Sequence, residues 1–66
     1  MKIEYDEATD TLTVLLRDGA VVVDSDEGKR GIVLDYDASG ELVSIEILDA
    51  SRRVTDARKV EFSMAV

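Results

Sequence analysis

The sequence contains no cysteine, no histidine and no proline, and its only aromatic residues are two tyrosines and one phenylalanine. Without cysteine no disulfide can form. Without cysteine and histidine the preferred ligands of zinc, copper and iron–sulfur clusters are missing, which argues against such sites. Without histidine the five serines have no base of the usual kind to activate them, and none lies in a nucleophile-elbow sequence. No glycine-rich phosphate loop precedes a helix. We therefore assign no catalytic residue, no cofactor-binding residue, no metal ligand and no cofactor.

The chain also has no long hydrophobic run. Its 66 residues fit a single small domain, residues 1–66. No segment approaches the roughly 18 apolar residues of a membrane span, and the charged N-terminus does not resemble a signal peptide. These features predict a cytoplasmic protein with no membrane partner. A domain this small buries only about 60% of the surface of its extended chain. With disulfides and soft metals excluded, self-association is the remaining means of stabilisation.

Acidic residues dominate what is present, with 15 Asp and Glu against 8 Lys and Arg and a net charge of −7. Residues 1–51 hold 13 acidic and 4 basic side chains, whereas residues 52–66 hold 2 acidic and 4 basic ones, so the balance changes from −9 to +2. An acidic body repels phosphate backbones over a Debye length of about 8 Å. We therefore expect no nucleic-acid partner.

Alternation of apolar and polar residues predicts a mostly β (α+β) fold, an antiparallel β-meander of five to six strands with one short helix near 50–57. The three consecutive valines of the third segment favour a strand, and Asp18-Gly19 before them is typical of a two-residue hairpin turn. Asp37-Ala38-Ser39-Gly40 predicts a second turn with Gly40 left-handed, and Asp49 or Ser51 is a candidate helix cap. The expected strands are residues 2–5, 11–17, 20–24, 30–36 and 41–48, with a last one at 59–66.

One motif suggests chemistry. Asp35, Asp37, Ser39, Gly40 and Glu46 have the spacing of positions 1, 3, 5, 6 and 12 of a calcium-binding loop. That loop requires a helix on each side, whereas both flanks here predict strands. The spacing therefore favours structural turn residues, and a weak divalent-cation-dependent binder or enzyme using Asp35, Asp37 and Glu46 is the alternative.

The stretch from Gly31 to Ser51, GIVLDYDASGELVSIEILDAS, together with Tyr5, Asp6, Asp10 and Leu12, resembles a family of small prokaryotic proteins. That family is the domain of unknown function numbered twenty-two eighty-three, and the resemblance covers about residues 1–53. It implies a bacterial or archaeal cytosolic protein and implies no activity. The basic segment and the alternating tail after Arg53 lie outside the resemblance.

Taken together, the residues favour a non-enzymatic, small acidic protein-interaction or oligomerisation module. Its partner would be a second copy of the chain or another protein. Alternation in the tail places Val60, Phe62, Met64 and Val66 on one apolar face. An uncovered strand edge is a template for pairing with another chain, so the tail is the segment through which we expect a homo-oligomer to form.

Overall fold

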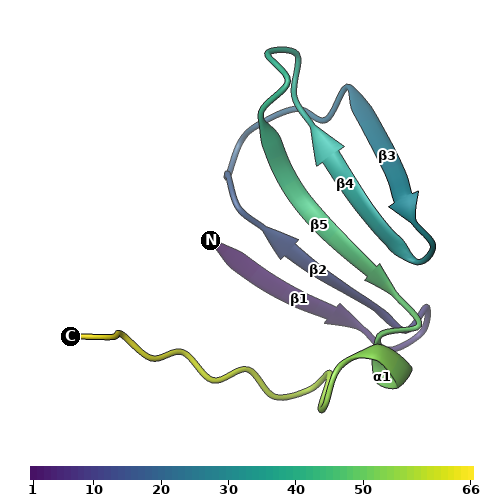
Figure 1. Ribbon diagram of the computed structural model, residues 1–66, viewed down its shortest axis with the longest axis vertical. Coiled ribbons are helices and arrows are strands. Elements are labelled where there is room, and N and C mark those ends of the chain that lie inside the picture. Colours follow the sequence, from purple (N-terminus) through teal and green to yellow (C-terminus); the bar gives the residue numbers. More distant parts are fainter.

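Five antiparallel strands form one sheet in the computed structural model, which describes residues 1–66 (Figure 1). The strands lie in the order β1-β2-β5-β4-β3, and a single helical turn follows the last strand. The mostly β class with one short helix is therefore confirmed. The elements are β1 (Lys2–Asp6), β2 (Thr11–Leu15), β3 (Asp24–Lys29), β4 (Ile32–Tyr36), β5 (Leu42–Leu48) and α1 (Ala50–Arg53).

The most apolar strand lies at the centre of the sheet. β5 has seven residues and pairs with β2 on one side and β4 on the other, so its backbone is hydrogen-bonded along both edges. β3, with the sequence DSDEGK, lies at one edge and all six of its residues are exposed. A charged edge strand opposes unwanted pairing with other chains. Only β3, β4 and β5 form a meander, because β5 lies between β2 and β4.

The expected third strand, residues 20–24, is wrong. Val21, Val22 and Val23 lie in the connection between β2 and β3 and are exposed. This connection must pass β5 and β4 to reach the far edge, which is three strand spacings or about 14 Å. The residues around the valines are needed to span that distance, and the charged segment that follows forms the edge strand instead. The expected hairpin at Asp18-Gly19 is also wrong, because only Gly19 has a positive φ, at 77°, whereas the two-residue turn with Asp-Gly requires two.

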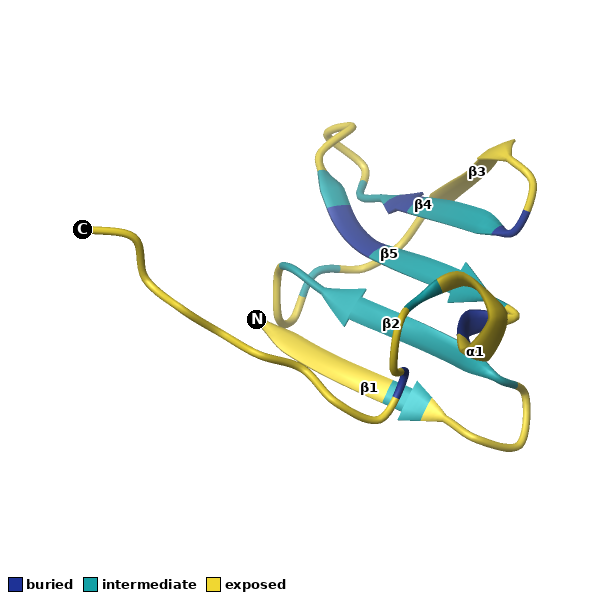
Figure 2. Ribbon diagram, turned by 60° about the horizontal axis from the view of Figure 1, so that its bottom comes forward, coloured by how far each residue is buried: buried dark blue, intermediate teal, exposed yellow.

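The C-terminal third departs further from the expectation. The helix near 50–57 is a single turn, α1, after which the backbone becomes extended at Val54. Residues 59–66 form no strand and extend away from the sheet beyond β1 (Figures 1 and 2). The predicted sixth strand is therefore wrong for the isolated chain, since no neighbouring strand pairs with it.

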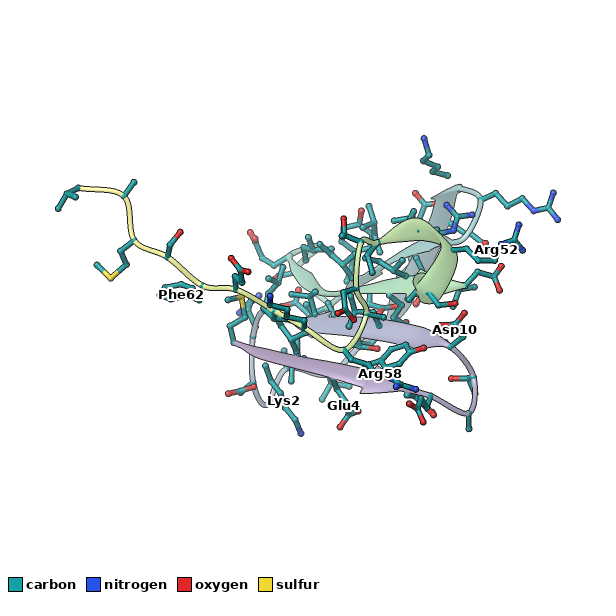
Figure 3. All side chains as sticks on the ribbon, turned by 90° about the horizontal axis from the view of Figure 1, so that it is seen from below. Lys2, Glu4, Asp10, Arg52, Arg58 and Phe62 are labelled. Atoms are coloured by element: carbon teal, nitrogen blue, oxygen red, sulfur yellow. The ribbon has the colours of Figure 1, made fainter.

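Cross-strand register gives the sheet two different faces. One, called the apolar face here, is the side of the sheet against which α1 and the residues after it pack; its members are Ile3, Tyr5, Leu12, Val14, Ile32, Leu34, Val43, Ile45 and Ile47. Lys2 and Glu4 lie on the opposite, polar face (Figure 3). Only three apolar side chains are buried, those of Val43, Ala50 and Ala57 (Figure 2). No helix has the length and hydrophobicity needed to cross a bilayer.

Candidate functional site

A carboxylate lies buried on the polar face, between hydroxyls from two neighbouring strands. Ser25 of β3, Asp35 of β4 and Ser44 of β5 are directly opposite one another in the sheet. The Ser25 hydroxyl donates to Asp35 Oδ1 at 2.6 Å, and the Ser44 hydroxyl donates to Oδ2 at 2.7 Å. Asp35 and Ser44 are only 4% and 5% exposed. Alternation along β5 places Ser44 on the face opposite Val43 and Ile45, and it reveals neither the partner of Ser44 nor its burial.

Glu46 joins this cluster from β5, two residues beyond Ser44. A hydrogen bond to Asp35, partial burial and the negative charge of Asp35 together raise the pKa of Glu46. Burial opposes ionisation of Asp35, but hydrogen bonds with Glu46, Ser25 and Ser44 outweigh it and hold the pKa of Asp35 below its usual value. Both shifts correspond to a pair in which a protonated Glu46 donates to the ionised carboxylate of Asp35, so that one proton lies between the two groups. Such a pair can give up or accept a proton, yet no apolar pocket adjoins it to hold a substrate.

Asp37 does not join the pair, although the calcium-loop spacing grouped the three carboxylates. Its Oδ1 accepts hydrogen bonds from the backbone N–H of Ser39 at 2.9 Å and of Glu41 at 3.0 Å. Its Oδ2 forms an ion pair with Arg17 at 2.7 Å. Asp37 therefore closes the β4–β5 turn, in which Gly40 has the expected positive φ, 83°. No set of three or more acidic side chains is arranged to hold a metal ion.

Asp10 anchors α1 from a distance of 41 residues along the chain. Its side chain accepts the Ser51 backbone N–H at 2.9 Å, the Ser51 hydroxyl at 2.7 Å and the Tyr5 hydroxyl at 2.6 Å, and its carbonyl accepts the Ala50 N–H. The bond to Tyr5, followed by those from Ser51, lowers the pKa of Asp10, and the same bond raises the pKa of Tyr5. Asp49, a candidate cap, instead has a left-handed φ of 53° and caps nothing with its side chain.

A polar hollow of about 400 Å³ lies where the β3–β4 turn approaches α1. Its lining consists of Arg30, Asp49, Arg52 and Arg53, with no apolar side chain. Gly31, which follows Arg30, is buried and has a φ of 82°, and the Arg53 guanidinium occupies the space that a side chain at Gly31 would need. Nothing in the one-dimensional pattern brings Arg30 close to Arg52 and Arg53, so this grouping was not predicted.

Residues 2–51 match the family described as "Protein of unknown function (DUF2283)". The chain belongs to DUF2283. The resemblance expected from the sequence over about residues 1–53 is thus confirmed. The DUF2283 segment contains all five strands and ends at Ser51, the residue that Asp10 holds in place. No curated protein and no solved structure matches the chain.

Proposed function

We propose that this DUF2283 protein is a non-enzymatic self-association module of the prokaryotic cytosol. In the proposed assembly, the tail of each copy, residues 59–66, joins the free edge of β1 in a second copy, with residues 59–62 as the paired strand. A reciprocal exchange of this kind gives a symmetric dimer, the commonest closed assembly. The observation that carries the proposal is the amount of apolar surface that the single chain leaves uncovered.

The exposed area of the chain is large for its mass. A folded monomer of 7.2 kDa exposes about 4100 Å² on average, whereas this chain exposes 5124 Å². The excess of about 1000 Å² is similar to the roughly 800 Å² per partner that a stable interface covers. The radius of gyration, 12.6 Å, also exceeds the value of about 11 Å expected for a compact domain of this length. The detached tail contributes to both quantities, and dimerisation would cover it.

The apolar residues of the tail have nothing to pack against within their own chain. Val60 is 57% exposed, Phe62 78% and Met64 81%. Figure 3 shows Phe62 well away from the sheet. Exposed apolar groups at this density favour a protein contact.

The two edges of the sheet differ in their capacity to accept such a strand. The β3 edge is occupied by charged residues, whereas β1 pairs only with β2 and its outer edge is free. The tail repeats the pattern of β1, with KVEF at residues 59–62 and KIEY at residues 2–5.

Pairing the tail antiparallel to β1 gives a favourable register. Placing Val60 opposite Ile3 sets Lys59 opposite Glu4 and Glu61 opposite Lys2. Both charged pairs then have opposite signs, which stabilises cross-strand neighbours by about 0.2–1 kcal/mol each. The long-range charges agree, because a segment with a balance of +2 approaches a body with a balance of −9.

Light scattering after size-exclusion chromatography tests the proposal at about 100 µM protein. We expect the full chain to be a dimer and a chain lacking residues 59–66 to be a folded monomer, with folding checked by circular dichroism. Phe62→Ser should weaken the dimer, whereas Val21→Ser, at a valine that is 72% exposed but lies in the β2–β3 connection, should not. A full chain that is monomeric overturns the proposal and would indicate that the tail folds onto its own sheet. A truncated chain that remains dimeric also overturns it.

The alternative, a divalent-cation-dependent binder or enzyme using Asp35, Asp37 and Glu46, has less support. Asp35 is already bonded to two serine hydroxyls and Asp37 to its own turn and to Arg17. Both carboxylates are therefore already engaged in structural bonds, with which a cation would have to compete.

A further inference from the structure

We propose that the hollow lined by Arg30, Asp49, Arg52 and Arg53 is a binding site for a phosphate group, carried as free phosphate or as a small phosphate monoester. The site lies at the end of the sheet that carries both the β3–β4 turn and α1 (Figure 1). It does not involve the tail residues or the β1 edge on which the proposed self-association depends.

The three arginines are unpaired in a chain with an excess of carboxylates. Four of the other five basic side chains, Lys2, Arg17, Arg58 and Lys59, form ion pairs. None of Arg30, Arg52 and Arg53 has a carboxylate oxygen within 4.0 Å, even though Asp49 lines the same hollow. Converging guanidinium groups without a partner favour an external anion, because an oxyanion would reduce their mutual repulsion.

The framework that carries the arginines is fixed from two sides. Ser51 donates two hydrogen bonds to the Asp10 side chain, from its N–H and its hydroxyl, and the Ala50 N–H donates to the Asp10 carbonyl. These bonds set the position of Arg52 and Arg53 on α1. Figure 3 shows Arg52 at the same end of the molecule as Asp10. On the other side, the Gly31 N–H donates to Glu27 at 2.8 Å and its carbonyl accepts the Leu48 N–H at 2.8 Å. Because Gly31 has no side chain, the Arg53 guanidinium lies directly over it. This pre-organisation reduces the entropy lost on binding.

The lining selects the class of ligand. It contains neither apolar nor aromatic side chains, so it offers no stacking platform for a nucleobase. Three arginines and one aspartate carry a local charge of +2, which matches a phosphate monoester of about −1.5 to −2 at neutral pH. Guanidinium groups bind phosphate oxygens in pairs. The net charge of −7 disfavours a long polyanion, so a small ligand with a single phosphate fits best.

Amide chemical shifts, followed during titration with inorganic phosphate and separately with phosphoserine at constant ionic strength, test the site. We expect saturable shifts at Arg30, Gly31, Arg52 and Arg53. If phosphoserine binds more tightly, the preferred ligand is a phosphate monoester. If inorganic phosphate binds more tightly, the preferred ligand is the free ion. Arg52→Gln and Arg30→Gln should each weaken binding about tenfold, the effect of losing one charge-assisted hydrogen-bonding group.

Arg17→Gln is the matched control, because it removes one positive charge from a residue paired with Asp37 and remote from the hollow. It should leave the affinity within twofold. Three results would each overturn the phosphate assignment. The first is that chloride at equal ionic strength produces the same shifts, and the second is that Arg52→Gln binds phosphate within threefold of the parent. The third is that a glutamate-rich peptide binds more tightly at these residues. The oligomeric state of the arginine variants should be unchanged, so the outcome is independent of the proposed self-association.

Discussion

Replacing Glu46 by glutamine should stabilise the protein at neutral pH. In the native chain, Glu46 can donate a hydrogen bond to Asp35 only while it is protonated, and its ordinary pKa is 4.5. As pH rises through the folded pKa of Glu46 this bond is lost, and the two carboxylates are then charged diagonal neighbours on adjacent strands. A glutamine amide donates to Asp35 at every pH and carries no charge. The substitution therefore reproduces the protonated glutamate without requiring a proton.

The sign of the pH dependence follows from the two pKa shifts. The raised pKa of Glu46 means that its contribution to stability is complete below the unfolded pKa and is lost as pH rises through the folded pKa. The lowered pKa of Asp35 means that its contribution is present above the unfolded pKa, ordinarily 3.8, and is lost as pH falls through the folded pKa. The native pair is therefore most favourable near pH 4, where Asp35 is ionised and Glu46 still holds its proton.

The expected gain is about 1 kcal/mol at pH 7, the net contribution of one hydrogen bond in a partly exposed position. In a domain of this size that raises the melting temperature by about 4–8 °C. Thermal unfolding of both chains, followed by circular dichroism at about pH 7 and pH 4, measures the difference. The gain should be largely absent at pH 4. Glu41→Gln, at an exposed glutamate with no ion pair, controls for the loss of one negative charge. An equal gain from both variants, or one that does not change with pH, would refute the proton-sharing pair.

Three further outcomes are expected. Gly40→Val should cost about 1–2 kcal/mol more in urea unfolding than Gly28→Val, because only Gly40 has a positive φ; equal losses would contradict the turn geometry. Raising the salt concentration to about 0.3 M should raise the melting temperature by screening repulsion among the 15 carboxylates; a flat or falling value would show that this repulsion is unimportant. Millimolar calcium should give no saturable amide shifts at Asp35, Asp37 or Gly40; saturable shifts together with a higher melting temperature would revive the cation-binding hypothesis.

The β4–β5 hairpin was predictable because its information is local. Alternation of β-branched residues set the two strands, and Asp37 with Gly40 set the turn between them. β1 and β2 were predictable for the same reason. The high apolar content of β5 favours its central position in the sheet, but strand order cannot be derived from alternation alone.

The contacts that position the candidate sites are not local. The Asp35–Glu46 pair depends on the register between β4 and β5. Its burial depends on Ser25, which lies in β3 but falls between the expected strands 20–24 and 30–36. The contact of Asp10 with Ser51 spans 41 residues. The three valines of the β2–β3 connection were predicted to form a strand and do not. Their strong local strand propensity is overridden because the connection must reach the far edge of the sheet.

The family match ends where the sheet is complete, so it separates the sheet from the C-terminal residues. Residues 2–51 contain the whole sheet and end at Ser51, whose bonds to Asp10 close the fold. Arg52, Arg53 and the apolar tail follow that closing contact and lie outside the family match. Arg30 and Gly31, by contrast, belong to the shared segment. The proposed phosphate site therefore combines one arginine from the family fold with two from outside it, whereas the proposed dimer contact joins an outside segment to the β1 edge. Both proposed activities require the residues beyond 51.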